Sequence, residues 1–549
     1  MKKVLAMLLA ALMVVSLMAG CGSKTEPAPA TPSTPSTPST PSTPSTPATP
    51  STPATPATPA TPAVEYDDTI VIGEVTDALY MSPWEALGSQ DIKYQNNIYE
   101  HLVTPAYDGS KMEGQLAESW EISEDGLTYT FKLRPNLKFS DGSDVTEEDW
   151  QWSFYRARDY QGSNALTRSE MIDTVSMPEK DTLVITLKYP CPPFISYCSS
   201  YNMVVASKKH FEEVGEEKFI ESPMGTGPYF LTDWKRNEHM YFEANPYYWN
   251  EGEPKTKYLK YEIVSDENTR YLQLQGGKID LAPMIPNTMM AQVEADPNLH
   301  GETFPSTQIR TMVLNTTIAP FNDPKVREAL RYATDKQEIA NIVALGYAKP
   351  VASSIPSAHG DFFNKNIKDP DVDFEKAKQM LIDAGYTPGQ IGAVINVSAT
   401  AAIYTDIATV LKSQWAKAGF ELTIEPLESA TLSEKTHSLS HQACIYQWTD
   451  GGTDPASLLG FICDYTESSH WYTGLDDKEL EAMYWDSQKE INYDKRVELI
   501  NKMQEIIYAE HCIIPIFQAD YTYGVSDKIQ GLNVSNGNRV NTYQLLKTK

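Results

Sequence analysis

Residues 125–134 read Asp-Gly-Leu-Thr-Tyr-Thr-Phe-Lys-Leu-Arg. The Asp-Gly pair favours a tight hairpin turn, because glycine adopts the backbone angles that such turns require. After the turn, apolar residues from Tyr129 to Leu133 alternate with Thr130 and Lys132. A period of two places the two sets of side chains on opposite faces of a strand. The stretch therefore predicts a half-buried strand in an antiparallel sheet.

The segments around this stretch predict a first half that is rich in strands. Residues 69–73 form a short β-branched run that ends in glycine, and residues 91–102 have the apolar spacing of an amphipathic helix. Thr146 precedes three carboxylates and predicts a helix N-cap. Residues 181–187 alternate like a further strand.

From residue 323 onward the pattern changes to helices that alternate with strands. Pro324 marks a helix start, and glycine follows two of the predicted helices as a C-terminal signal. The predicted helices are 374–384, 403–418 and 493–509, and the predicted strands are 422–424 and 521–525. Such alternation favours an α/β domain in which helices cover a sheet.

Length and composition bound the class of protein. The chain has 549 residues, of which 41% are hydrophobic and 10% aromatic. Residues 64–549 are too many for one core, because domains commonly hold about 100–200 residues. Lys and Arg number 45 against 73 Asp and Glu, a formal net charge of −28. A surface this acidic repels phosphate backbones, which argues against nucleic acid as a partner.

The first 20 residues have the features of a secretory signal. Lys2 and Lys3 give a positive start, and residues 4–18 form an apolar run. The run is shorter than the roughly 20 residues that cross a bilayer as a helix. Residues 17–21, Leu-Met-Ala-Gly-Cys, resemble the lipobox of bacterial lipoproteins. This resemblance implies that Cys21 becomes the lipidated N-terminus and anchors the mature chain to the membrane. The alternative is an ordinary signal peptide.

Residues 21–63 predict a disordered tether. Threonine recurs at every third position from Thr31 to Thr61, and proline follows each one. Proline at this density prevents both helix and sheet. As polyproline II, at ~3.1 Å per residue, the segment would reach on the order of 100 Å. We expect it to hold the folded body away from the membrane.

Five cysteines lie beyond Cys21, so the folded body cannot pair all of them. Cys191 and Cys198 are the best local pair by spacing. Buried thiols are an equal alternative, because unpaired cysteine is among the most buried residue types.

Motifs with known chemistry are weak in this chain. Residues 225–228, Gly-Thr-Gly-Pro, predict a tight structural turn, since no lysine follows as it would in a phosphate loop. The sequence has no Gly-x-Ser-x-Gly elbow and no His-Glu-x-x-His motif. His437, His441 and Cys444 have metal-like spacing, but the cysteine falls where a strand begins. We therefore predict no metal and no cofactor.

The strongest ligand-binding candidate is the stretch of residues 446–455. It reads Tyr-Gln-Trp-Thr-Asp-Gly-Gly-Thr-Asp-Pro, a strand that ends in tryptophan and opens into a glycine-rich loop with carboxylates. An aromatic wall beside a negative charge suits an amino group that is flanked by apolar side chains. The candidate contacts are Tyr446, Trp448 and Asp450. The alternative for Asp450 is a loop carboxylate that caps its own turn.

The order of motifs along the chain resembles one family, the large extracytoplasmic solute-binding proteins that serve ABC importers for oligopeptides, dipeptides and nickel. The resemblance covers residues 66–549, which makes it more specific than any single motif. Besides 125–134 and 225–228, its motifs here are Leu-Ala-Glu-Ser-Trp at 116–120, Phe-Ser-Asp-Gly at 139–142, Asn-Pro-Tyr-Tyr-Trp at 245–249, Gly-Lys-Ile-Asp at 277–280, Val-Arg-Glu-Ala-Leu at 326–330, Ala-Gly-Tyr at 384–386, Arg-Val-Glu-Leu at 496–499 and Ile-Pro-Ile at 514–516.

The resemblance implies an α/β, two-lobed periplasmic-binding-protein-like fold of type II, in its large three-segment form, with a hinged ligand cleft. The expected division is 1–20 signal peptide, 21–63 tether, 64–109 with 206–308 and 520–549 lobe I, 110–205 a subdomain packed on lobe I, and 309–519 lobe II. The change to helix–strand alternation near residue 310 agrees with this division. Two connections between the lobes would form a hinge that closes on ligand.

The resemblance also implies a function, that of a lipid-anchored substrate-binding component of an ABC importer without enzymatic activity. The protein would capture oligopeptides or dipeptides in the cleft and deliver them to a membrane permease. It would act as a monomer on the extracytoplasmic face of the cell membrane.

The same resemblance implies roles for individual residues. Trp448 matches a pocket-lining tryptophan of peptide-binding relatives. Gly451 occupies the position of their ammonium-binding aspartate, with Asp450 one residue before it, and both are candidate contacts. Tyr80 and Trp84 would face the same cleft, with core packing as an equal alternative for each.

Other functions stay open at this point. A different solute, such as a nickel chelate or a glycan, would suit the same cleft. A secreted hydrolase that uses paired carboxylates belongs to another class, but no motif nominates its acid and base. An adhesion module on a stalk would bind polymer and would not be stabilised by small ligands.

Overall fold

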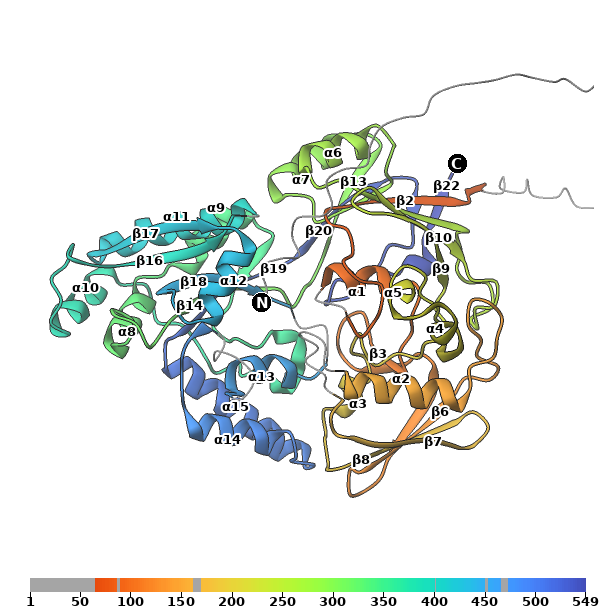
Figure 1. Cartoon of the computed structure of the whole chain (residues 1–549). Helices are drawn as coiled ribbons and strands as arrows, with labels where there is room; N and C mark the ends of the chain where they lie inside the picture. The colour runs from red at the N-terminus through yellow and green to blue at the C-terminus, as the bar shows by residue number, and fades with distance from the viewer. Residues whose placement is uncertain (1–64, 86–88, 161–168, 400, 450–452, 466–471) are drawn as a thin grey trace, which may run out of the picture. The chain divides into compact units, whose positions relative to one another are not determined.

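The computed structural model describes residues 65–85, 89–160, 169–399, 401–449, 453–465 and 472–549. Contacts divide the chain into residues 1–62 and a compact unit of residues 63–549. The predicted signal peptide and Cys21 lie outside the described residues, as does the whole of the tether. The unit that is described is a mixed α/β structure with two large sheets and smaller ones (Figure 1).

The larger sheet takes its strands from distant parts of the chain, in the order β13-β20-β12-β2-β11-β10-β9. The strands are β2 Thr69–Glu74, β9 Tyr229–Lys235, β10 His239–Ala244, β11 Tyr258–Ile263, β12 Leu281–Pro283, β13 Leu299–Phe304 and β20 Tyr521–Ser526. β2 is parallel to β11 and β12, and the other pairs are antiparallel. The strands predicted at 69–73 and 521–525 are confirmed.

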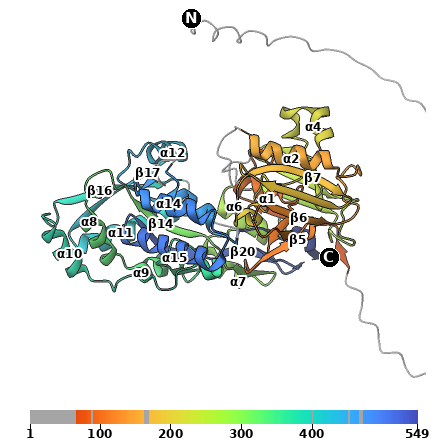
Figure 2. The same ribbon diagram turned by 90° about the horizontal axis from the view of Figure 1, so that it is seen from below.

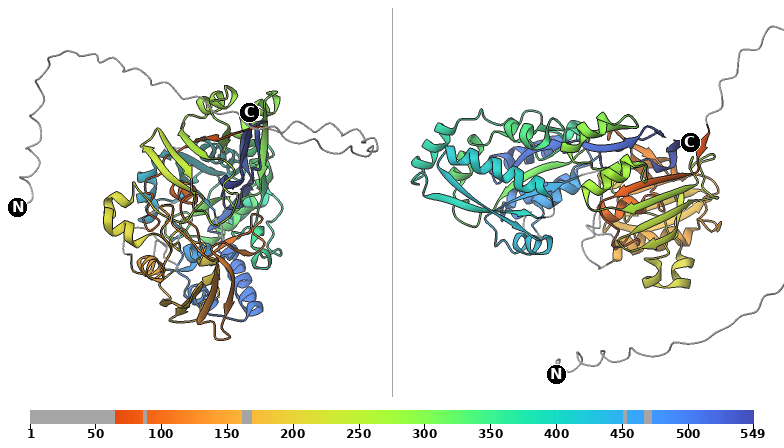
Figure 3. Two further views of the ribbon diagram at one scale, coloured as in Figure 1. Left: turned by 90° about the vertical axis from the view of Figure 1, so that its right-hand side faces the viewer. Right: turned by 90° about the horizontal axis from the view of Figure 1, so that it is seen from above.

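The two ends of this unit meet in a small sheet. The last strand, β22 (Leu546–Thr548), pairs with β1 (Tyr66–Asp67) and β21 (Ile529–Gln530), so the C-terminus lies beside the first described strand (Figure 3).

A four-stranded antiparallel sheet, β5-β6-β8-β7, contains the stretch of residues 125–134. Its strands are β5 Ala117–Ile122, β6 Thr128–Leu133, β7 Ile172–Glu179 and β8 Thr182–Leu187. In β6, Tyr129, Phe131 and Leu133 are buried. The alternation in the sequence therefore identified both the strand and its buried face.

Helix α2 (Glu147–Asp159) covers this sheet and packs on β7 (Figures 1 and 2). Its N-cap is Thr146, as predicted. The Thr146 hydroxyl accepts the Asp149 N–H at 3.3 Å, and the Asp149 carboxylate accepts the Thr146 N–H at 2.9 Å. This capping box satisfies two N–H groups that the helix itself cannot bond.

The second large sheet is formed by the other half of the chain, in the order β15-β19-β14-β18-β16-β17. Its strands are β14 Ile309–Leu314, β15 Ala348–Pro350, β16 Ile391–Ser398, β17 Phe420–Leu427, β18 Ala443–Trp448 and β19 Ile513–Ala519. Its helices are α8 Pro324–Tyr332, α9 Lys336–Ala344, α10 Phe374–Asp383, α11 Ala402–Lys417, α12 Ser429–His437, α13 Ala456–Cys463, α14 Lys478–Ser487 and α15 Tyr493–Ala509. The predicted α/β alternation is confirmed.

Each face of this sheet packs against a separate layer of helices. Met312 and Leu314 of β14 belong to one core cluster, and Ile309 and Val313 belong to another. The first cluster includes side chains from α8, α9, α10 and α11, and the second includes side chains from α12, α13, α14 and α15. Residues on opposite faces of one strand thus lie in two different cores.

The helix predicted at 91–102 is shorter than expected. Helix α1 spans Ser89–Gln95, and the chain turns at the next residues. The Asn97 side-chain amide donates to the carbonyl oxygens of Lys93 and Tyr94, at 3.3 and 3.1 Å. Side chains that bond nearby backbone groups in this way compete with helical hydrogen bonds.

Residues 225–228 form the tight structural turn that the sequence predicts. The Gly227 N–H donates to the Ile98 carbonyl oxygen at 2.7 Å. A Cβ on Gly225 would lie 2.2 Å from that same oxygen. Glycine is required here because the turn lies directly against the segment that follows α1.

The same turn holds a buried carboxyl, that of Glu100. Its oxygens accept hydrogen bonds from Thr226 Oγ1 at 3.1 Å, Tyr248 Oη at 3.0 Å and Trp249 Nε1 at 3.0 Å. Burial nevertheless raises the pKa of Glu100 to about 7, because desolvation of the charged form outweighs these hydrogen bonds.

This raised pKa predicts a pH dependence of stability. The folded protein keeps the Glu100 proton up to about pH 7, whereas the unfolded chain releases it near the ordinary value of 4.5. The native state binds more protons between these values, so the contribution of Glu100 to stability falls as pH rises from about 4.5 to 7 and is level above that. The loss amounts to at most about 3 kcal/mol. Urea denaturation of wild type and Glu100→Gln from pH 4.5 to 8 measures it. If the free energies of unfolding of wild type and Glu100→Gln change with pH in parallel, the raised pKa of Glu100 is contradicted.

Of the two alternatives for the pair at 191 and 198, the structure has buried thiols and no local disulfide. Cys198 is an unbridged thiol, and Cys191, Cys444, Cys463 and Cys512 are buried as well. Burial raises the pKa of Cys198.

Among the residues with described coordinates, no helix combines the length and the apolar character that a membrane crossing requires.

Candidate functional site

The chain passes between the two large sheets twice, at residues 305–308 and at Asp520. The two crossing segments are hydrogen-bonded to each other. The Ala519 N–H donates to the Gln308 carbonyl oxygen at 3.0 Å, the Ser306 hydroxyl donates to the Ala519 carbonyl oxygen, and Gln518 Nε2 donates to the Ser306 carbonyl oxygen. Strand β14 begins directly after the first crossing, and β18 ends opposite that start, so Ile309 and Trp448 lie at the edge of the sheet where the chain crosses.

Trp448 and Tyr446 lie on the central strand β18, which pairs antiparallel with β14. Trp448 lies opposite Ile309, with 6% of its surface exposed, and it belongs to the cluster that includes Leu458 and Leu459 of α13. The indole of Trp448 is therefore held rigidly at the end of the strand.

Tyr446 lies opposite Thr311 and is partly buried. Its ring contacts that of Tyr472 edge-on, with centroids 5.2 Å apart. Burial raises the pKa of both phenols, so both stay protonated at neutral pH and can donate hydrogen bonds.

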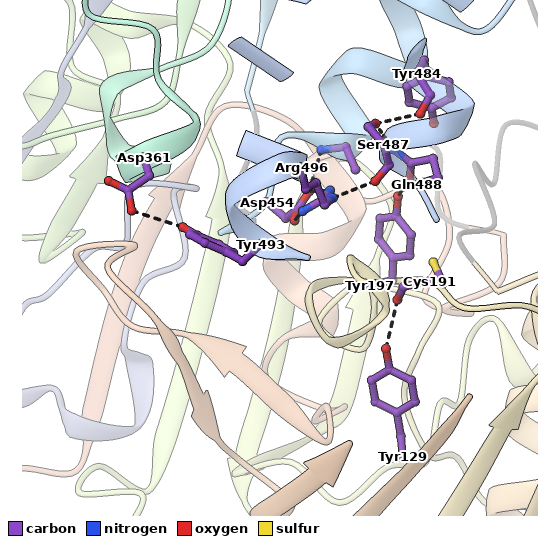
Figure 4. A network of polar contacts seen from close by, with 11 residues as sticks. Tyr129, Cys191, Tyr197, Asp361, Asp454, Tyr484, Ser487, Gln488, Tyr493 and Arg496 are labelled. Carbon is purple, nitrogen blue, oxygen red and sulfur yellow. Dashed lines mark hydrogen bonds and ion pairs between the residues drawn. The ribbon is translucent and has the colours of Figure 1, made fainter. Parts of the chain in front are cut away.

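Asp450 and Gly451 fall outside the described residues, so their predicted contacts stay predictions. The chain is described again from Thr453, and Asp454 is held firmly. Arg496 of α15 donates two hydrogen bonds to the Asp454 carboxylate, at 2.5 and 2.8 Å. Its Nε donates to the Ser487 carbonyl oxygen of α14 at 2.8 Å (Figure 4). The pair fixes the backbone just beyond the predicted contact residues.

A second contact joins this region to the part of the chain that contains the four-stranded sheet. The Tyr197 hydroxyl donates to Gln488 Oε1 at 2.8 Å, and the two residues are buried (Figure 4). They line a cavity of about 380 Å³, together with Tyr189, Tyr484 and Trp485. The contact links residues 291 positions apart in the sequence.

Tyr80 and Trp84 lie in the loop between β2 and α1, as predicted. Trp84 is fully buried, its ring lies edge-on to Trp152 at 5.0 Å, and Arg156 lies 5.1 Å from its centre. Trp84 therefore packs in the core, which is one of the two alternatives that the sequence left open. Tyr80 is half-buried, and Gln95 Nε2 donates to its carbonyl oxygen at 3.0 Å.

Sequence reasoning missed Arg310, which precedes Thr311 on β14. Arg310 is 6% exposed, and burial lowers the pKa of its guanidinium from the ordinary value. The signal was present in the sequence. The strand reads Ile-Arg-Thr-Met-Val-Leu from residue 309, with one charge in a buried run.

The metal-like spacing of His437, His441 and Cys444 is divided among different elements. His437 ends α12 and its Nδ1 lies 2.7 Å from the Ser433 carbonyl oxygen, whereas Cys444 lies in β18. Within the described ranges, no three His, Cys, Asp or Glu side chains gather as metal ligands would.

Comparisons with known proteins agree on one family. The model described as bacterial extracellular solute-binding proteins, family 5 middle, matches residues 111–470. Heme-binding protein A of Haemophilus influenzae is 28% identical over 463 residues, which cover 79% of this chain and 84% of that protein. The glutathione-binding protein GsiB of Escherichia coli is 28% identical over 460 residues, which cover 81% and 88%.

A solved structure shows the same fold. The periplasmic binding protein DppA of Helicobacter pylori, in complex with the peptide STSA, matches with a TM-score of 0.76 at 23% identity. The match covers 88% of this chain and 99% of that one. The predicted α/β, two-lobed periplasmic-binding-protein-like fold is confirmed.

Proposed function

The chain belongs to the family 5 bacterial extracellular solute-binding proteins, and from this premise we propose that it captures oligopeptides or dipeptides for an ABC importer. Members of this family bind solutes outside the cytoplasm, and the function is binding and delivery to a permease rather than catalysis. We propose in addition the solute, the residues that hold it, the lobes that enclose it and the attachment to the membrane.

The observation that carries the peptide assignment is the aromatic end of β18. Trp448 and Tyr446 lie at the end of a central strand, next to the segment that Asp454 and Arg496 hold in place. Rigid aromatic walls with adjacent polar groups suit peptide side chains and backbone. DppA of Helicobacter pylori, which binds the peptide STSA, has the same fold.

The cleft would lie between lobe I (64–109, 206–308 and 520–549), with its subdomain (110–205), and lobe II (309–519). The hydrogen-bonded crossings at 305–308 and at residue 520 are the expected hinge. Closure would trap ligand between Trp448 and the loop that carries Tyr80. In this proposal Asp450 takes over the ammonium-binding role that Gly451 cannot perform.

Mass spectrometry of ligand that co-purifies with the protein tests the proposal. We expect peptides, and titration with a purified peptide should raise the free energy of unfolding by about 2.7 kcal/mol at a hundredfold excess over Kd. The same peptide in N-acetylated form, tested on wild type and on Asp450→Asn, shows whether Asp450 binds the ammonium group.

If mass spectrometry instead finds a heme, a glutathione, a nickel chelate or a glycan, that compound and not a peptide is the solute. Two relatives are named for heme and for glutathione, so these two serve as the matched competitors in every titration.

The second experiment concerns attachment. The small residues before Cys21 support lipidation of its thiol, and several acyl chains at ~0.8 kcal/mol per buried CH₂ would hold the protein at the membrane. We expect Cys21→Ser to move the protein from the membrane fraction to the medium. Wild-type protein that is found only in the medium, without acyl chains, would refute the anchor.

A further inference from the structure

Arg310 is the exception among the buried arginines. Five arginines in the described part of the chain are buried. Four of them donate to protein oxygens: Arg270 to the Val264 carbonyl at 2.8 Å, Arg327 to Glu510 at 3.0 Å, Arg331 to Asp369 at 2.8 Å, and Arg496 to Asp454. For Arg310, by contrast, Nε and Nη1 are buried and have no hydrogen-bond partner within the described residues.

An unpaired guanidinium in this position is costly. Burial removes several kcal/mol of solvation free energy from a charged group, and no counter-charge among the described residues offsets this loss. Four comparable arginines show that this chain supplies partners where a role is structural. Because no side chain of the described residues supplies a partner for Arg310, we expect a bound solute to supply it.

The surroundings of Arg310 favour an anion. The groups that face its guanidinium are the phenols of Tyr404 and Tyr521, and no carboxylate of the described residues forms an ion pair with it. The guanidinium carbon lies 5.5 Å from the centre of the Tyr404 ring. The Tyr404 hydroxyl lies 3.5 Å from Gln447 Oε1, and Gln447 is opposite Arg310 on the neighbouring strand.

Tyr404 also places a helix N-terminus at this point. It is the third residue of α11 (Ala402–Lys417), whose N-cap, Ala401, provides no side-chain hydrogen bond. The first turn contains no acidic residue, and Ala401 and Ala402 are exposed. The N–H groups in the first turn of a helix carry partial positive charge that an anion can satisfy.

We propose that Arg310 and the first turn of α11 form a carboxylate-binding subsite, so that the imported solute must carry a carboxylate that lies beside Tyr404, on the face of β14 opposite that of Trp448. The location of the subsite in the ligand cleft rests on the proposed function. One guanidinium and one helix end match a single negative charge, and the planar fork of arginine matches the two oxygens of a carboxylate. In a peptide, this group is the C-terminus or an acidic side chain.

Three peptide pools test the subsite on the full-length protein. They are tripeptides with free C-termini, the same tripeptides as C-terminal amides, and amides that each contain one glutamate. Wild type is expected to bind the free acids at least tenfold more tightly than the plain amides. Binding of the glutamate-containing amides at acid-like affinity assigns the carboxylate to a side chain, and their failure assigns it to the C-terminus.

Two variants and a control complete the test. Arg310→Gln removes the charge and should bind acids and amides equally, whereas Arg310→Lys keeps the charge without the fork and should retain part of the preference. Lys412→Gln removes an exposed charge from the same helix and should retain all of it. Arg310→Gln should fold at least as stably as wild type without ligand, because it loses a buried unpaired charge.

Acetate gives a readout that does not depend on peptides. At constant ionic strength, acetate in place of chloride should raise the melting temperature of wild type but not of Arg310→Gln. If no pool binds and acetate still distinguishes the two proteins, the peptide assignment fails and the subsite stands. If wild type binds acids and amides equally, the subsite is overturned and the peptide assignment stands. If neither peptides nor acetate distinguish wild type from Arg310→Gln, the subsite is overturned.

Discussion

Asp454→Asn is expected to lower the free energy of unfolding by about 3–5 kcal/mol, because it leaves Arg496 buried beside a neutral partner. Only 3% of the Arg496 side chain and 10% of the Asp454 side chain are exposed. The two hydrogen bonds between them and the bond from Arg496 to Ser487 join the start of α13, the end of α14 and the start of α15. Urea denaturation measures the loss.

A double variant and a surface pair serve as controls. Asp454→Asn combined with Arg496→Met removes the unpaired charge, so the double loss should be smaller than the sum of the single losses. Glu213→Gln breaks the pair between Lys209 and Glu213, whose side chains are 77% and 61% exposed, and should cost less than about 1 kcal/mol. Equal losses at the buried and the surface pair would refute the structural role of Arg496.

The elements that the sequence predicted well are those with a local physical cause. Alternation of apolar residues located β6, the side chain of Thr146 located the start of α2, and the range predicted for α15 agrees with its limits at both ends. In α1 a local signal was also present but was outweighed, because the Asn97 side chain bonds the backbone of the helix end. Local chemistry therefore decided both the successes and this error.

The candidate site could be predicted only in part, for a different reason. The position of Trp448 at the end of a strand agrees with the sequence, whereas its contact with ligand stays a prediction. The partner of Asp454 lies 42 positions away, and that of Tyr197 lies 291 positions away, so neither can be read from spacing. Arg310 is distinguished by a missing partner, which is a property of the folded protein and not of the sequence. Chemistry that depends on which distant groups meet, or fail to meet, needs the structure.

Trp448→Ala is expected to weaken peptide binding by roughly thirtyfold or more, because a rigid aromatic residue at the centre of a binding site commonly contributes 2 kcal/mol or more. The indole is 6% exposed and packs against the cluster of α13, so its removal leaves a cavity as well as a missing wall. The same variant should therefore lose about 3–5 kcal/mol of stability. Calorimetric titration, at a temperature where circular dichroism shows the variant to be folded, measures the affinity.

Leu459→Ala is the control that distinguishes the loss of a ligand contact from the loss of folding stability. Leu459 is fully buried in the same cluster but belongs to α13 and not to β18. Its truncation should cost about 2–5 kcal/mol of stability and leave the affinity of the folded protein unchanged. Trp448→Phe keeps an aromatic surface and should fall between wild type and Trp448→Ala in affinity. If Trp448→Ala and Leu459→Ala reduce affinity equally, Trp448 acts through the core and not through the ligand. If Trp448→Ala binds as tightly as wild type, β18 does not form the wall of the peptide site.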